Sequence, residues 1–173
     1  MNANDPRRER LANDHAGLVK LARESGGTVE VLEAEGTPPT RHRVRLRCRG
    51  PFAPCQVVEA HTIEIVAGAE YPLRPPEARF VTPIFNPHVH PDGRICLGTK
   101  TGLSERLEDL VVRIGGLIQY DPALIDPKSP ANWTALAYFQ AIRTTLPFGR
   151  ETFRRERERP APAAPALVWK ERR

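Results

Sequence analysis

The segment YPLRPPEARFVTPIFNPHVHPDGRICLG, residues 71–98, is the most informative part of this chain. It holds six of the 18 prolines, and from Thr82 onward its 17 residues follow neither a helical nor a strand period. Loops of this length are uncommon inside a compact domain unless they are functional. Its single cysteine, Cys96, stands between Ile95 and Leu97, whose side chains can anchor the backbone while the sulfur faces solvent. We therefore expect a functional loop built around this thiol.

The chain before this segment predicts a helix followed by consecutive strands. Asp5 can cap the helix, Pro6 suits its first position, and Ser25 followed by two glycines ends it. Residues 42–49 alternate between apolar side chains and arginines, which predicts a half-buried antiparallel strand with one wet face. The other predicted strands cover residues 28–33, 57–66 and 78–81.

Two further helices are predicted after the loop. Apolar residues recur over residues 107–118 at the spacing of a buried stripe, and we attribute the two glycines in this stretch to close packing. A second proline-rich loop, DPALIDPKSP at 121–130, leads to a helix that starts near Asn132 and ends before Pro147. A helix, then consecutive strands, then helices predict an α+β fold with a four-stranded antiparallel meander sheet.

Composition and charge limit the class of protein. The formal net charge of +5 permits nucleic-acid binding, but the arginines of residues 43–49 lack the interleaved aromatic side chains on which single-strand binders stack bases. We therefore interpret these arginines as a solvated strand face. No apolar run approaches the ~20 residues that span a bilayer, and the N-terminus has no apolar core of a secretory signal.

The cysteines indicate the compartment of the protein, and the C-terminal composition indicates where its domain ends. The three cysteines are odd in number and form no CxxC motif, which favours a reducing, cytoplasmic location. We divide the chain into a domain over residues 1–150 and a charged, Pro/Ala-rich tail over residues 151–173. Within the tail, residues 167–169 form a short apolar plug behind a proline-rich spacer.

Five short motifs in order make the central segment similar to the core of the ubiquitin-conjugating enzyme family. Downstream, Asp121-Pro122-x-x-x-Asp126-Pro127 resembles the gate loop of that family, and the likeness covers roughly residues 6–146. The resemblance implies the ubiquitin-conjugating fold and a transferase that carries a ubiquitin-like protein as a thioester on Cys96, with no cofactor. The five motifs are Tyr71-Pro72, Pro75-Pro76, Phe80-x-Thr82, Asn86-Pro87-His88 and Gly93-x-Ile95-Cys96-Leu97.

The resemblance also implies catalytic roles for three residues, namely Cys96, His88 and Asp126. Cys96 is the acceptor thiol. His88 takes the place of the family's Asn side chain, where it either stabilises an oxyanion or holds the loop by bonding backbone groups. Asp126 falls at the gate-loop acid that orients or deprotonates an incoming lysine, although an Asp before a proline is also typical of a turn. We place Tyr120 beside the same cleft.

The cations near the thiol invite two further interpretations. Arg94, His88 and His90 are the nearest candidates to stabilise a thiolate, which predicts moderate reactivity rather than a protease-like ion pair. The two histidines and Cys96 could also suggest zinc, but zinc prefers four ligands at recognisable spacing and the sequence offers no second cluster. We therefore expect no metal.

The chain departs from the family pattern in three places, and the last two concern recognition by a ligase. Asn86 and His88 exchange the residue types at the ends of the tripeptide, GLSE at 102–105 replaces the ligase-docking Trp-Ser-Pro-Ala loop, and GPFAPCQ at 50–56 replaces a Tyr-x-Gly-Gly hairpin. Together they resemble divergent bacterial members that work beside their own activating enzyme and ubiquitin-like protein, often in antiphage defence operons.

The implied partners are an activating-type enzyme, a ubiquitin-like protein and a protein substrate. Neither a membrane nor nucleic acid is expected among them. A rival interpretation is a non-catalytic binding module that keeps the fold to grip a ubiquitin-like protein. Such variants typically lack the acceptor cysteine, whereas this chain has Cys96 in register.

Overall fold

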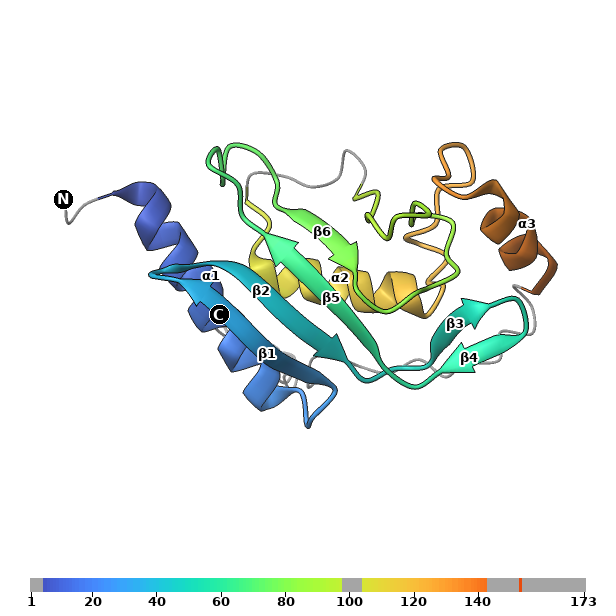
Figure 1. The fold of residues 1–173 in the computed structure, drawn as a ribbon, viewed down its shortest axis with the longest axis horizontal. Coiled ribbons are helices and arrows are strands. Elements are labelled where there is room, and N and C mark those ends of the chain that lie inside the picture. The colour runs from blue at the N-terminus through green and yellow to red at the C-terminus, as the bar shows by residue number, and fades with distance from the viewer. Residues whose placement is uncertain (1–4, 98–103, 143–152, 154–173) are drawn as a thin grey trace, which may run out of the picture.

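The computed structural model describes residues 5–97, 104–142 and 153 (Figure 1). A four-stranded antiparallel sheet forms its centre, with neighbouring strands in the order β1-β2-β5-β6. Strands that follow one another along the chain are neighbours in this sheet, apart from a hairpin inserted between β2 and β5, so the predicted α+β meander is confirmed. The strands are β1 (Val29–Gly36), β2 (Pro39–Leu46), β5 (His61–Val66) and β6 (Glu77–Phe80).

The inserted hairpin is a two-stranded sheet of β3 (Gly50–Ala53) and β4 (Gln56–Val58). The sequence predicts one continuous strand over residues 57–66, and this part of the prediction is wrong. β4 pairs with β3, whereas His61 at the start of β5 pairs with Leu46 of β2. Tertiary pairing sets this break, because the residues on both sides of it have similar strand propensity.

Three helices lie in the described part of the chain, and the first two have the predicted limits. Asp5 caps the first helix by accepting a hydrogen bond from the Arg7 amide at 3.0 Å, and the Ser25 amide ends it by donating to the Leu21 carbonyl at 2.9 Å. Within the described residues, no helix is both long and apolar enough to cross a membrane. The helices are α1 (Pro6–Glu24), α2 (Leu107–Ile118) and α3 (Trp133–Ile142).

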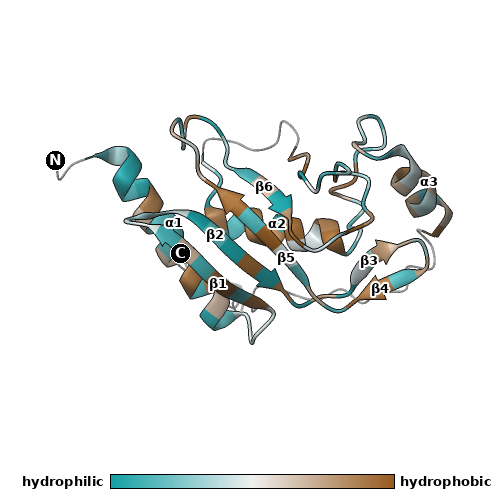
Figure 2. Cartoon of the chain, in the orientation of Figure 1, coloured by the Kyte–Doolittle hydropathy of each residue, from teal (hydrophilic) through white to brown (hydrophobic). Residues whose placement is uncertain are grey.

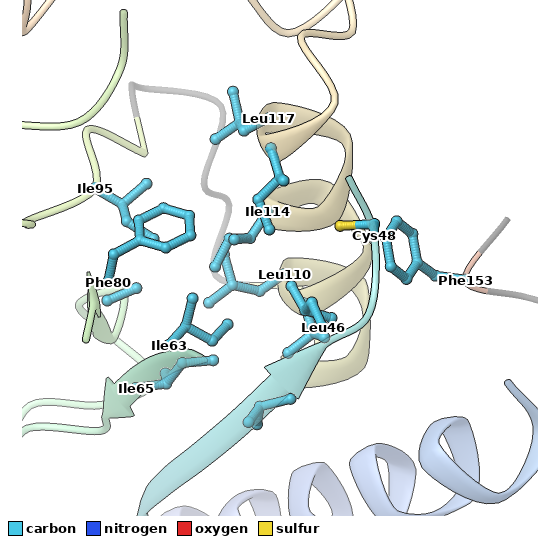
Figure 3. Packing of buried hydrophobic residues seen from close by; sticks show 14 of the residues in the cluster. Leu46, Cys48, Ile63, Ile65, Phe80, Ile95, Leu110, Ile114, Leu117 and Phe153 are labelled. Carbon is cyan, nitrogen blue, oxygen red and sulfur yellow. The ribbon is translucent and has the colours of Figure 1, made fainter. Parts of the chain in front are cut away.

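The core lies between the sheet and the helices α1 and α2, and α2 runs behind the sheet in Figure 1. Hydrophobic and hydrophilic residues alternate along β5 (Figure 2), and the buried set includes Leu46 of β2 and Ile63 of β5. Leu110 and Ile114 of α2 face this set (Figure 3). Cys48 continues the alternation into the core at 2% exposure, as predicted.

Two glycines of α2 allow later parts of the chain to pack closely against the helix. Phe153 is buried in the same core cluster (Figure 3), and a Cβ at Gly115 would come within 2.3 Å of Phe153 Cε2. A Cβ at Gly116 would lie 2.7 Å from Leu124 Cδ1. The prediction that close packing explains these glycines is confirmed.

Charged side chains occupy the outer face of the sheet. Arg43 pairs with Glu33 at 3.1 Å, and Glu30 pairs with both Arg45 and Arg47 at 3.3 and 3.4 Å. We call these five residues the charge ladder. Their side chains are all between 37% and 57% exposed. Because each of these arginines faces a carboxylate of β1, the positive charge of the ladder is substantially neutralised within the sheet.

Candidate active site

The segment after β6 folds back against the sheet, and we call residues 86–96 the cysteine loop. The Phe80 amide donates to the Gly93 carbonyl at 2.8 Å, and the Ile95 amide donates to a carbonyl of β6 at 2.9 Å. Gly93 has a φ of 86°, and a Cβ there would lie 2.7 Å from the Phe80 carbonyl oxygen, so this turn requires glycine. Ile95 is buried, as predicted, and this anchor leaves the following Cys96 at the edge of the core, partly exposed.

Asn86 fastens the start of the cysteine loop to α2. Its side chain is fully buried, its Nδ2 donates to the Leu117 carbonyl at 2.7 Å, and its Oδ1 accepts from the His88 amide at 2.9 Å. The Pro87 carbonyl accepts from the amides of residues 131 and 132 at 2.8 and 3.0 Å. Buried polar groups require such partners. Through these contacts the tripeptide at residues 86–88 joins the loop to α2 and to the segment before α3.

His88 connects the cysteine loop with the gate loop, residues 121–127. Its carbonyl accepts from the Cys96 amide at 2.7 Å, and its Nε2 accepts from the Asp126 amide at 2.8 Å. A ring nitrogen that accepts a hydrogen bond carries no proton, so the neutral tautomer with its proton on Nδ1 satisfies this contact. Burial lowers the pKa of His88 below its usual 6.5, and the nearby Asp126 carboxylate offsets part of that shift. The imidazole is therefore neutral at pH 7.

The two loops and α2 line a cleft of about 330 Å³. Cys96, a free thiol, lines it together with His88 and Asp126, so the structure brings the three predicted residues into one site. Asp126 is exposed, and its Oδ1 accepts from the Lys128 amide at 2.9 Å. A partly exposed thiol beside a carboxylate and a neutral imidazole has the groups needed to accept an acyl group and release it to an amine.

A sequence profile described as ubiquitin-conjugating enzyme matches residues 46–141, which is more than half of the chain. The chain belongs to the ubiquitin-conjugating enzyme family. The matched residues run from the end of β2 into α3 and include every residue that lines the cleft. The fold is therefore that of a ubiquitin-conjugating domain.

Individual relatives resemble a shorter stretch. Ubiquitin-conjugating enzyme E2 T of Mus musculus is 47% identical over 36 residues, which are 21% of this chain and 18% of the relative. The same enzyme of Homo sapiens is 46% identical over 35 residues, 20% of this chain and 18% of the relative. Ubiquitin-conjugating enzyme E2 G2 of Homo sapiens is 50% identical over 28 residues, 16% of this chain and 17% of the relative. The matched stretch spans less than a fifth of the length of these relatives.

Two residues that the sequence places near the thiol lie elsewhere in this ubiquitin-conjugating domain. Tyr120 is fully buried, its hydroxyl donates to the Phe85 carbonyl, and its ring packs edge-on against Phe139 at 5.3 Å, so it does not flank the cleft. Burial also raises the pKa of Tyr120. Arg94 pairs with Asp92 at 2.7 Å, has a 68% exposed side chain and is not part of the cleft wall. Its charge is thus largely solvated and engaged away from the sulfur.

Sequence reasoning overlooked Arg113, a cation that does line the cleft. A signal was available, because Arg113 lies one turn before Leu117 at the edge of the apolar stripe of α2, and a charge that is partly buried there requires a partner. Among the residues that the structure describes, no group of three or more His, Cys, Asp or Glu side chains is placed to hold a metal ion.

Proposed function

We propose that this chain accepts a ubiquitin-like protein as a thioester on Cys96 and transfers it to a lysine or another acceptor. The observation that carries the proposal is the placement of Cys96, a free and partly exposed thiol in a cleft that also contains His88 and Asp126. A cysteine used only for packing is buried, as Cys48 is at 2% exposure. An activating-type enzyme supplies the acyl group, and a protein substrate supplies the acceptor.

Charging is a thioester exchange between two cysteines. The Cys96 thiolate attacks the carbonyl carbon of the thioester that joins the ubiquitin-like protein to the activating enzyme. A new C–S bond forms at Cys96, the C–S bond to the enzyme's sulfur breaks, and that sulfur leaves as a thiolate. Nothing is oxidised or reduced, and the proton that Cys96 loses returns to the leaving sulfur through solvent. This step depends on docking and on an accessible sulfur.

Discharge onto a lysine depends more strongly on the cleft. The amine nitrogen attacks the thioester carbonyl, a tetrahedral oxyanion forms, and cleavage of the C–S bond returns the thiolate of Cys96. The attacking nitrogen must also lose a proton. Asp126 is our candidate for orienting the amine or accepting this proton, because its carboxylate is exposed in the cleft and the Lys128 amide fixes its direction.

His88 acts in this proposal by holding the cysteine loop and the gate loop together. Its Nε2 accepts from the Asp126 amide, so this nitrogen is not available to donate to an oxyanion. A donor role would require the Nδ1 side of the ring to face the thioester. Of the two roles that the sequence leaves open, the contacts of His88 therefore favour loop holding.

The wider setting of the proposal rests on the sequence. We propose a conjugating domain over residues 1–150 and a tail over residues 151–173, with Phe153 as the contact of the tail with the core. A cytoplasmic location and a place in a bacterial antiphage pathway are likewise proposals. The apolar plug at residues 167–169 and part of the altered ligase-docking loop, residues 102–103, lie outside the described residues.

A charging assay on a non-reducing gel tests the function. The protein is incubated with ATP, ubiquitin and a ubiquitin-activating enzyme, and in parallel with any activating and ubiquitin-like proteins encoded beside its gene. Wild type should form an adduct that a thiol reductant removes, and Cys96→Ser should form a reductant-resistant ester or nothing. Cys55→Ser and Cys48→Ser are the matched controls and should charge.

Two outcomes would change the assignment. An adduct that persists in Cys96→Ala would show that another group is the acceptor. Stable noncovalent binding of the ubiquitin-like protein, with no adduct in wild type, would support the alternative of a non-catalytic binding module.

A further inference from the structure

Arg113 of α2 ties together two segments near the thiol. Its Nη1 donates to the Leu97 carbonyl at 2.9 Å, while its Nε and Nη2 donate to the two carboxylate oxygens of Glu105 at 2.9 and 2.7 Å. The side chains of Arg113 and Glu105 are each only 17% exposed. A two-pronged pair of this kind fixes the direction of the guanidinium as well as attracting it.

As a result, hydrogen bonds hold the backbone on both sides of the sulfur. Before it, the Cys96 amide donates to the His88 carbonyl at 2.7 Å. After it, the Leu97 carbonyl accepts from Arg113. Because the Cys96 amide and the carbonyl of the next residue are both held, the backbone between them has little freedom to carry the sulfur away from the cleft.

We propose that Arg113 is a positioning residue for Cys96, an inference that rests on the thioester function proposed above. Arg113 acts through the carbonyl of Leu97, the residue that follows the cysteine, and keeps the sulfur at a fixed place relative to His88 and Asp126. Reaction rates respond steeply to such placement, since a displacement of about 1 Å can lower a rate about 10²-fold.

The orientation of Arg113 is supported in turn by α1. Arg10 of α1 donates to the backbone carbonyl of Glu105 and, through its Nε, to Asp14 at 2.8 Å. Asp14 also accepts from the Leu107 amide in the first turn of α2 at 3.3 Å. A continuous line of polar contacts thus runs from α1 through Glu105 and Arg113 to the residue after the thiol. Glu105 links its two halves, with its carbonyl toward α1 and its carboxylate toward α2.

A purely electrostatic role for Arg113 is the competing explanation, and the contacts disfavour it. The Glu105 carboxylate balances the guanidinium charge, and the third donor is directed at a carbonyl rather than at the sulfur. The two roles predict different results when lysine replaces Arg113. Arg113→Lys keeps the charge but carries all its donors on one nitrogen, so it cannot form the two-pronged pair with Glu105 that fixes the direction of the side chain. A charge role therefore predicts full activity for Arg113→Lys, whereas positioning predicts partial activity.

The test is single-turnover discharge of purified thioester onto free lysine at increasing lysine concentration. Arg113→Met should lower the maximal rate about 10- to 100-fold without changing the half-saturating lysine concentration. Arg113→Lys and Glu105→Gln should fall between Arg113→Met and wild type. Arg45→Met is the matched control, because it breaks an arginine–glutamate pair on the outer face of the sheet, and it should stay within about twofold of wild type.

Hydrogen exchange provides a second readout that does not depend on charging. In the uncharged protein, the peptide containing Cys96 should exchange about 10-fold faster in Arg113→Met than in wild type or Arg45→Met, since one of its two tethers is gone. If Arg113→Met does not fold, Arg113→Lys and Glu105→Gln carry both measurements.

The outcomes separate this inference from the proposed function. If Arg113→Met charges normally and discharges at the wild-type rate, the positioning role is overturned. Full activity of Arg113→Lys would overturn it too. If wild type forms no thioester, the proposed function fails, and unchanged exchange at the Cys96 peptide would then overturn the positioning role independently.

Discussion

The cysteine loop beside the cleft and the charge ladder both depend on polar side chains, but they use them in opposite ways. In the cysteine loop, Asn86 and His88 are at most 6% exposed, and their contacts run from 2.7 to 2.9 Å. In the ladder, the ion pairs span 3.1–3.4 Å between side chains that are at least 37% exposed, and Glu30 serves two arginines. The contacts of the cysteine loop are therefore buried and specific, whereas those of the ladder are exposed and can substitute for one another.

This difference predicts how each region responds to substitution. A buried polar group that loses its partner costs about 1–3 kcal/mol, because water cannot replace the partner. An exposed ion pair typically contributes about 0–1 kcal/mol, because water and salt compete with it continuously. We expect effects on discharge and stability to be large for cleft and core contacts and small for the ladder.

The largest effect is expected at Asp126. Asp126→Ala should leave thioester formation nearly unchanged but slow discharge onto lysine about 10²–10⁴-fold, the usual contribution of a general base. The defect should shrink as pH rises toward the lysine pKa of about 10.4, where the free amine deprotonates without help. Single-turnover discharge measured across pH tests both points.

The gate loop contains a matched control for Asp126. Asp121 Oδ1 accepts from the Ala123 amide at 3.0 Å, the same kind of turn contact that Asp126 makes with Lys128, but Asp121 does not line the cleft. Asp121→Ala should therefore discharge close to the wild-type rate. Equal defects in the two variants would mean that the turn geometry, and not a carboxylate in the cleft, controls discharge.

His88 should show the next largest effect. His88→Ala removes the acceptor of the Asp126 amide and should slow discharge about 10²-fold through displacement of the gate loop. His88→Asn should recover most of the rate, since an Asn Oδ1 can accept the same hydrogen bond. In wild type, acidification should slow discharge once His88 is protonated, below the usual histidine pKa because burial lowers it. If the Asn variant is as slow as the Ala variant, acceptance of the Asp126 amide does not explain the defect, and the loop-holding role fails.

The two regions also differ in how well the sequence predicts them. Strand alternation identifies the sheet and its arginine face, since an apolar period of two depends only on neighbouring residues. The motif around Cys96 identifies the loop and its thiol. In these two places, local pattern and tertiary structure agree.

Long-range contacts account for what the sequence does not predict. The contact between His88 Nε2 and the Asp126 amide joins residues 38 apart, and Arg113 reaches Leu97 from 16 residues away. Tyr120 is predicted beside the cleft because it precedes the gate loop, but its φ of 55° and its bond to the Phe85 carbonyl belong to the core. Such placements depend on how separate elements pack, and propensity and periodicity do not identify the partner of a side chain.

His61 tests whether burial or nearness to the cleft decides how strongly a polar side chain affects the protein. It is the first residue of β5 and lies in the core, away from the cleft. It is fully buried, and neither ring nitrogen has a hydrogen-bond partner within the described residues. Burial lowers its pKa from 6.5 to about 4. The unfolded chain therefore binds more protons between these values, and stability should fall by up to about 3 kcal/mol as pH drops from 6.5 to 4.

His61→Leu should flatten this profile and raise stability at every pH, since it removes two unpartnered nitrogens from the core. Urea unfolding at pH 7, 5.5 and 4 measures both effects. His42 supplies part of the remaining slope, because burial and neighbouring His15 lower its pKa to about 4 as well. If stability depends on pH as steeply in His61→Leu as in wild type, the pKa of His61 is not lowered in the folded state.

The smallest effect is expected in the charge ladder. A double-mutant cycle of Arg45→Ala and Glu30→Ala should give a coupling energy of about 0.2–1 kcal/mol in urea unfolding, and less in 1 M salt, where the screening length falls to about 3 Å. Arg47 stands beside the same carboxylate and can compensate for the loss of Arg45, which lowers the coupling further. A coupling above about 2 kcal/mol that survives in salt would contradict this expectation. The ladder would then hold its side chains as firmly as the cleft does, and exposure alone would not explain why the two polar regions differ.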